Sequence, residues 1–105
     1  MRGDIHRLKA PKDARGHEQR GIRYGVVVQS DFLRLSSTLV APTSTSARPA
    51  SFRPEIVLNG TLTRILIEQT QAIDPEVRLG EFAGRLSTAE LRAVDLALAA
   101  VFGLD

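Results

Sequence analysis

Short apolar runs separated by polar or glycine-containing segments fill most of the chain before residue 87. The clearest run is Val26–Val28, which is β-branched throughout and bounded by Gly25 and Gln29, a pattern typical of a buried strand. A strand that contains Pro42 should end close to it, because proline cannot donate to a strand ladder. We predict strands over residues 4–9, 23–30, 38–43, 53–58, 61–72 and 79–86.

The segments between these runs carry turn and loop signals. Asn59-Gly60 between two apolar runs predicts a β-hairpin with a type I′ turn. Residues 10–22 lack periodicity over a length that is usually functional or disordered. Residues 44–53, rich in Ser, Pro and Arg, predict a mobile loop that could form a second wall of a groove. Residues 32–35 are compatible with one helical turn, and Asp74-Pro75 starts a turn.

The end of the chain predicts a helix. Ser87 and Glu90 have the spacing of a capping box, and Gly103 stands where a helix stops. One face at helical spacing carries Leu91, Val94, Leu98, Val101 and Phe102, and the opposite side carries Ala93, Leu96 and Ala100. A helix that is apolar on nearly all sides predicts two packing partners, its own sheet and another subunit.

The order of these elements predicts a mainly β, small α+β fold, in which a bent antiparallel barrel carries a C-terminal helix and residues 1–105 form one domain. The chain has no Cys, so disulfides and thiolate sites are excluded. With only His6 and His17 as imidazoles, we expect no metal site and no cofactor. We expect no membrane association, because no apolar run reaches membrane length and no signal peptide is recognisable, and hence a cytoplasmic protein.

Charge is divided unevenly along the chain. Residues 1–53 carry ten basic and four acidic side chains, whereas residues 54–105 carry four basic and eight acidic ones. Apart from Lys9 and Lys12, every basic residue is an arginine, whose planar fork of donors suits phosphate and whose face stacks on bases. This distribution indicates that the protein binds a polyanion, with nucleic acid as the first candidate.

Several short motifs follow one another in the order and spacing of a known family. They are RGDI at 2–5, GHEQRGIR at 16–23, VVVQSD at 26–31, VAPT at 40–43, IEQTQAID at 67–74 and VFGL at 101–104. Together they resemble the MazF/PemK toxins, which are mRNA endoribonucleases of bacterial type II toxin–antitoxin pairs. The resemblance implies an SH3-like barrel that works as a homodimer, with RNA in a groove at the dimer interface.

The resemblance also implies roles for single residues. Arg23 matches the catalytic arginine and Thr43 its partnering hydroxyl. Glu18 and Gln19 match a loop that contacts RNA, and Gln69 matches a position near the substrate. Arg20 and Ser44 are further RNA-binding candidates. The chain departs from the family pattern at His6, His17 and Tyr24, where the family has an aromatic, a small hydroxyl and a proline, respectively.

These residues suit RNA cleavage without a metal, because RNA carries its own nucleophile in the 2′-OH. Arg23 could bind the non-bridging oxygens where negative charge develops, and Thr43 could donate one more hydrogen bond. An arginine stays protonated, so His17 and Glu18 are better candidates for proton transfer. Each residue also has a structural interpretation: Arg23 could pair with an acid, Thr43 could be an ordinary strand-end hydroxyl, and His17 could be an exposed loop imidazole.

We therefore expect a sequence-specific endoribonuclease that acts on single-stranded RNA, with mRNA as the first substrate and tRNA or rRNA as alternatives. Its expected partner is an antitoxin whose acidic, disordered tail neutralises the basic half of the chain. Two other functions stay open. One is a non-enzymatic toxin of the same fold that binds DNA gyrase, as the CcdB type does, and the other is an RNA-binding barrel that has lost its active site.

Overall fold

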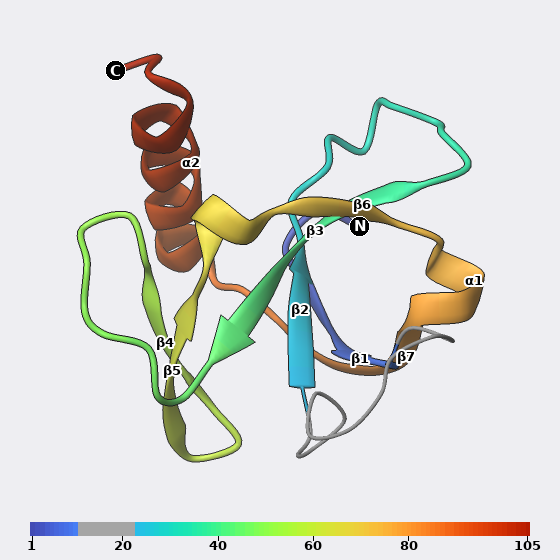
Figure 1. Ribbon diagram of the computed structural model, residues 1–105, viewed down its shortest axis with the longest axis horizontal. Coiled ribbons are helices and arrows are strands. Elements are labelled where there is room, and N and C mark those ends of the chain that lie inside the picture. Colours follow the sequence, from blue (N-terminus) through green and yellow to red (C-terminus); the bar gives the residue numbers. More distant parts are fainter. Residues whose placement is uncertain (11–22) are drawn as a thin grey trace.

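A single antiparallel sheet, curled into a half-barrel, holds most of the chain, and a long helix lies at its open side (Figure 1). The structure is a computed structural model that describes residues 1–10 and 23–105. The mainly β fold with a C-terminal helix, predicted from the sequence, is confirmed. The elements in chain order are β1 (Asp4–Leu8), β2 (Arg23–Val27), β3 (Thr38–Ser44), β4 (Glu55–Leu58), β5 (Thr61–Ile65), the 3-10 helix η2 (Ile67–Gln69), β6 (Gln71–Ile73), α1 (Pro75–Arg78), β7 (Leu79–Arg85) and α2 (Thr88–Phe102).

The strands follow the order β4-β5-β3-β2-β1-β7, with β6 also paired to β3. β1 therefore lies between β2 and β7, so the first strand of the chain pairs with the last one. β3 lies at the centre, with β2 on one side and both β5 and β6 on the other. The side chains at the start of β2 and the end of β3 are therefore neighbours.

The prediction of one long strand over residues 61–72 is wrong. β5 pairs Ile65 with Thr43, and β6 pairs Gln71 with Val40, so the second segment is three residues out of register with the first. Those extra residues form η2, whose first residue, Ile67, is buried. A curled sheet needs such a corner, and apolar patterning within the segment carries no information about where the sheet must bend.

The predicted hairpin is confirmed. Asn59 and Gly60 both have positive φ, 52° and 77°, as a type I′ turn requires, and β4 and β5 pair from Leu58 and Thr61 onward. The helical turn considered for residues 32–35 is absent. Instead, a turn is closed by a hydrogen bond from Leu33 N to Ser30 O, and Phe32 within this turn is 97% exposed.

Helix α2 has the predicted ends but only part of the predicted packing. Ser87 and Glu90 form both bonds of the capping box, and Gly103 ends the helix in the left-handed conformation. Val94 and Ala97 are buried, with Leu91 and Leu98 packed beside them. Val101 and Phe102, which belong to the same predicted face, are exposed because the last turn of the helix projects past the sheet (Figure 1).

The main apolar core lies between the curled sheet and α2. Val26 from β2, Ile65 from β5, Ile67 from η2 and Val94 from α2 are each at most 1% exposed and belong to the same cluster. Burying side chains of this size stabilises a fold by about 1.5–3 kcal/mol each. This core therefore fixes the strands that bear the pocket described below.

The N-terminal segment ties α2 to the sheet. The Arg2 guanidinium donates from Nε to the carbonyl of Val28 at 2.9 Å and pairs through a second nitrogen with Asp95 of α2 at 2.6 Å. Gly3, with φ of 91°, allows the tight turn that leads into β1. Within the described residues, no helix is long and apolar enough to cross a membrane.

Candidate functional site

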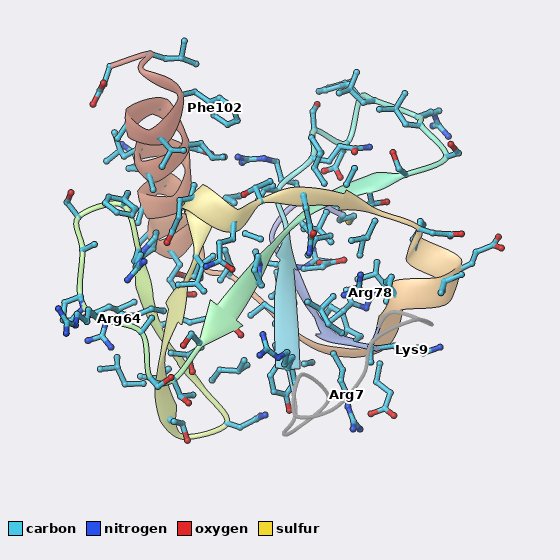
Figure 2. All side chains as sticks on the ribbon, in the orientation of Figure 1. Arg7, Lys9, Arg64, Arg78 and Phe102 are labelled. Carbon is cyan, nitrogen blue, oxygen red and sulfur yellow. The ribbon has the colours of Figure 1, made fainter. Side chains whose placement is uncertain are left out.

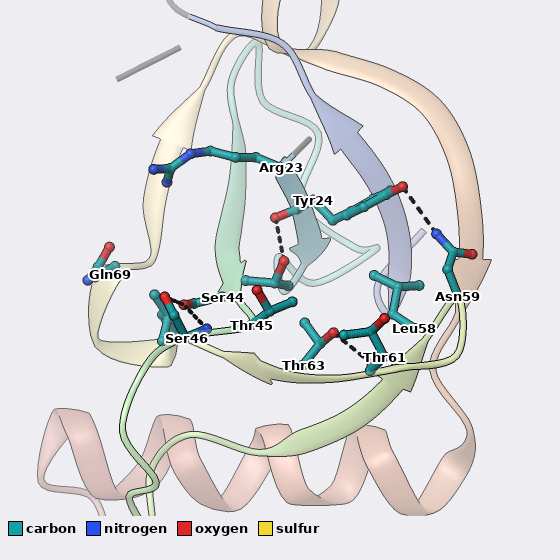
Figure 3. Close-up of a pocket in the computed structure, with 12 residues that line it drawn as sticks. Arg23, Tyr24, Ser44, Thr45, Ser46, Leu58, Asn59, Thr61, Thr63 and Gln69 are labelled. Carbon is teal, nitrogen blue, oxygen red and sulfur yellow. Dashed lines mark hydrogen bonds between the residues drawn. The ribbon is translucent and has the colours of Figure 1, made fainter. Parts of the chain in front are cut away.

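An open pocket of about 690 Å³ lies where β2 begins and β3 ends, and it extends to the β4–β5 hairpin (Figure 3). Its lining is mostly hydroxyl and amide side chains. The described residues that line it are Arg23, Tyr24, Thr43, Ser44, Thr45, Ser46, Leu58, Asn59, Thr61, Thr63, Leu66 and Gln69. Arg23 is the one residue of this set that carries a formal charge at neutral pH, so the described lining is polar and positive in character.

The structure brings the two predicted catalytic residues into this one pocket. Arg23 is the first residue of β2 and is exposed, and Thr43 lies near the end of β3 and is 8% exposed. β2 and β3 are paired through Gly25 and Pro42, so the two side chains belong to neighbouring strands. The Thr43 hydroxyl donates a hydrogen bond of 3.1 Å to the backbone carbonyl of Tyr24, which fixes its rotamer.

That bond determines whether the Thr43 hydroxyl can donate or accept a hydrogen bond with a ligand. Its hydroxyl proton is directed to a backbone acceptor, and its oxygen keeps lone pairs for a ligand. From the sequence, Thr43 was expected to donate to the substrate. In this arrangement it instead offers an acceptor, held in place by the strand beside Arg23.

Two of the predicted RNA-binding residues also line the pocket. Gln69, on η2, is exposed and lies on the same side as the Arg23 guanidinium in Figure 3. The Ser44 hydroxyl accepts hydrogen bonds from the backbone nitrogens of Ser46 and Ala47, at 3.1 and 2.9 Å. Ser44 therefore shapes the loop that follows β3, in addition to facing the pocket.

The remaining predicted site residues, His17, Glu18, Gln19 and Arg20, lie outside the described residues. Their roles in proton transfer and RNA binding therefore stay predictions.

The loop after β3 forms a second wall of the pocket, as expected for residues 44–53. Two arginines hold this loop. Arg64 donates to the carbonyl of Ala47 at 3.0 Å and pairs with Glu55, and Arg53 donates to the carbonyl of Arg48 at 2.9 Å and pairs with Glu68. Some of the arginines of the chain therefore stabilise the fold.

Several pocket residues were not identified from the sequence. Tyr24 and Asn59 stand out, because the Asn59 side-chain nitrogen donates to the Tyr24 hydroxyl at 3.1 Å across the pocket. In the sequence, Tyr24 stands out only as a departure from the family pattern. The sequence around Asn59 indicates a turn, and nothing in a hairpin signal indicates that this turn lies beside β2. In the described ranges, no cluster of three or more His, Asp or Glu residues has the geometry to hold a metal ion.

Comparison with known proteins gives matches over nearly the whole chain. Residues 1–102 match the model of the PemK-like, MazF-like toxins of type II toxin–antitoxin systems. A candidate toxin of Mycobacterium tuberculosis is 40% identical over 104 residues, which cover 99% of this chain and 98% of that protein.

Solved structures share the fold at low sequence identity. The Mycobacterium tuberculosis toxin MazF-mt6 superimposes with a TM-score of 0.79 at 20% identity, over 97% of this chain and 98% of the other. An endoribonuclease from a mycobacterial species, solved in complex with its cognate antitoxin, gives a TM-score of 0.77 at 14% identity, over 100% and 96%. At these identities the structural matches bear on the fold alone.

Proposed function

Since the chain belongs to the PemK-like, MazF-like toxins of type II toxin–antitoxin systems, we propose that it acts as a sequence-specific endoribonuclease, which cleaves single-stranded RNA without a metal ion. The 2′-OH next to the scissile phosphate is the nucleophile. The products carry a 2′,3′-cyclic phosphate on one side and a 5′-OH on the other.

The observation that carries this proposal is the pairing of Arg23 with Thr43 in an open polar pocket. Arg23 is the charged member of the described lining, and a guanidinium presents two parallel N–H donors to a phosphate. No carboxylate occurs among the described residues that line the pocket, so an anionic ligand meets no repulsion from them. The pocket therefore suits a phosphodiester.

In the proposed reaction, the 2′-oxygen attacks phosphorus, the bond from phosphorus to the 5′-oxygen breaks, and the 2′,3′-cyclic phosphate forms. Arg23 binds the non-bridging oxygens, on which negative charge grows in the transition state. The Thr43 oxygen accepts a hydrogen bond from the 2′-OH and so orients it. Glu18 and His17 remain the predicted groups that take the proton from the 2′-OH and give one to the 5′-oxygen.

We propose a homodimer for the working enzyme. The predicted second partner of α2 is consistent with three exposed apolar side chains on or after it: Leu96 (67%), Phe102 (65%) and Leu104 (78%). Apolar side chains gathered on one element are costly to leave in water and mark interaction surfaces. A second copy of the chain would cover them.

The proposed protein partner is an antitoxin with an acidic, disordered tail. The structural match that was solved with its antitoxin supports this partner for the fold. The basic excess of residues 1–53 supplies the complementary charge, and such binding should weaken as salt is added. The toxin would act in the cytoplasm, on mRNA first, with tRNA and rRNA as further candidate substrates.

The decisive experiment incubates the purified protein with a long RNA of mixed sequence in EDTA. We expect cleavage at a small set of sites, identified by primer extension, and products that carry a 2′,3′-cyclic phosphate. A single 2′-deoxy substitution before the cut should abolish cleavage there. Activity that is lost in EDTA and restored by Mg²⁺ would contradict the mechanism.

The same preparation distinguishes the other two functions. RNA that binds but stays intact would indicate a barrel without catalysis. Inhibition of DNA gyrase, with RNA neither bound nor cut, would indicate a toxin of the CcdB type.

A further inference from the structure

We infer that the end of the pocket away from Arg23 is a nucleobase subsite, in which Tyr24 stacks on one unpaired base and Asn59 binds the edge of that base. This subsite deepens the proposed function and rests on it, because it takes the ligand to be single-stranded RNA with a phosphate at Arg23. It assigns a specificity role to residues that the family resemblance does not mark.

The pocket has two chemically different ends. Arg23 and Tyr24 are consecutive in β2, so their side chains leave the strand in different directions. In Figure 3, Arg23 points toward Gln69, and Tyr24 points toward Asn59. Thr43 lies between the two ends through its hydrogen bond to the Tyr24 carbonyl. A nucleotide has the same two parts, an anionic phosphate and a flat aromatic base.

The Tyr24 ring is held firmly enough to act as a stacking platform. It is partly buried and packs against the main core cluster, and it also lines the pocket. Leu58, which lines the same end, is 8% exposed and adds an apolar wall. Aromatic side chains of this kind bind unpaired bases by stacking, whatever the base.

Asn59 supplies what stacking lacks, namely the means to discriminate between bases. One N–H of its amide is used by the Tyr24 hydroxyl at 3.1 Å, and this bond orients the whole amide group. Among the described residues, the other N–H and the amide oxygen have no partner, so they present an adjacent donor and acceptor. Such a pair binds a base edge through two hydrogen bonds. Tyr24 therefore acts both as the platform and as the positioning residue for Asn59.

A charged side chain outside the pocket lining lies next to Tyr24. Arg7 of β1 is the cross-strand partner of Tyr24, so their side chains lie on the same face of the sheet. Arg7 is exposed, and Figure 2 shows it on the side of the molecule where Lys9 and Arg78 also lie. A base stacked on Tyr24 would thus have Arg7 within reach of its own backbone phosphate.

The first experiment uses fluorescence, because Tyr24 is the only tyrosine of the chain and the chain has no tryptophan. The full-length protein is titrated with a single-stranded DNA oligonucleotide, which lacks the 2′-OH and cannot be cut by the proposed route. We expect saturable quenching of the tyrosine signal. An abasic oligonucleotide of equal length, which has the phosphates without the bases, should leave the signal largely unchanged. Phe82→Leu, an exposed aromatic on β7, serves as the control variant and should behave as the parent does.

The second experiment maps cleavage sites for two conservative variants. Tyr24→Phe keeps the ring and removes the bond to Asn59. Asn59→Gly removes the amide and keeps a residue that adopts φ of 52° without strain. Both should relax the base preference at the same single nucleotide next to the cut, by about ten-fold. Tyr24→Ala, which removes the platform, should weaken binding of the oligonucleotide by about ten-fold or more.

The subsite is overturned if base-bearing and abasic oligonucleotides change the fluorescence equally, or if neither binds. It is also overturned if Tyr24→Phe and Asn59→Gly keep the parent's base preference while they cleave RNA. Failure of the proposed function gives a different result, because RNA would then stay intact whether or not bases quench Tyr24.

Discussion

The side chain of Thr43 is hydrogen-bonded to the backbone of Tyr24, the residue that follows Arg23, over 3.1 Å. Thr43 comes from β3 and Arg23 from β2, so this bond fastens the hydroxyl to the strand that carries the guanidinium. The relative position of the two groups is therefore set by backbone pairing and by one side-chain bond, before any ligand arrives. Preorganisation of this kind lets a site stabilise charge without rearranging during the reaction.

The Thr43 bond predicts different outcomes for two substitutions. Thr43→Val keeps the shape and removes the hydroxyl, which leaves the Tyr24 carbonyl without that partner. We expect a loss of about 1–3 kcal/mol in the free energy of unfolding and a strong loss of RNA cleavage. Thr43→Ser, which retains the hydroxyl, should retain most of both. Urea denaturation and single-turnover cleavage measure the two effects. Full cleavage by Thr43→Val would remove Thr43 from the mechanism.

Arg23→Ala should lower the rate of RNA cleavage by on the order of 10²–10³, because it removes a donor to the developing charge. Arg23→Lys should recover only part of this rate, since an ammonium group cannot reproduce the planar fork. The fold should be unaffected, because Arg23 is exposed at the start of its strand. Arg92→Ala, an exposed arginine on α2, is the matched control. Equal rates for the Arg23 and Arg92 variants would exclude the proposed role.

Gly25→Ala should destabilise the fold by roughly 1–3 kcal/mol through overpacking. A Cβ at residue 25 would stand 2.6 Å from Val40 Cγ1 and 2.9 Å from Leu8 Cδ1, which is closer than carbon atoms tolerate. Thermal and urea unfolding measure the loss. Val40→Ala makes room, so the double variant should be less destabilised than the two single changes summed. If the two losses of stability simply add, the added Cβ is not strained against Val40.

Leu96→Glu should convert the proposed homodimer into a folded monomer. Leu96 is 67% exposed on α2, so a charge there costs little within one chain and much at a contact between two apolar faces. Light scattering gives the molar mass, and circular dichroism verifies the helix. Arg34→Ala, at an exposed position outside α2, is the control. A parent protein that is monomeric at micromolar concentration would contradict the dimer itself.

Local signals predicted the local structure well. Ser87, Glu90 and Gly103 mark the two ends of α2, and Asn59-Gly60 marks the hairpin, because each of these features needs only neighbouring residues. The corner at η2 was missed for the opposite reason. Residues 61–73 must follow β3 and also turn with the curled sheet, and that requirement comes from strands distant in the chain.

The candidate site shows the same difference between features that the local sequence predicts and contacts that depend on the fold. Arg23, Thr43 and Gln69 are found through the family motifs, and Ser44 is a further RNA-binding candidate; the structure places all four around one pocket. Tyr24 and Asn59 were missed as partners, because they are 35 residues apart and meet only when the β4–β5 hairpin folds beside β2. Val101 and Phe102 satisfy a helical pattern, but a pattern does not say where the sheet beneath the helix ends.

The place of α2 in the core bears on how the protein is made. Every described residue that lines the pocket precedes residue 70, yet β2, β5 and η2 are held by a cluster that includes Val94 and Ala97. During synthesis, the residues for the pocket leave the ribosome well before the helix that packs beneath them. The pocket residues are therefore synthesised while the cluster is still exposed to water, and the pocket takes its shape only once α2 has emerged and packed. A message cut short before the codons for α2 would yield a fragment that lacks Val94 and Ala97, so the pocket forms only in a chain that includes α2.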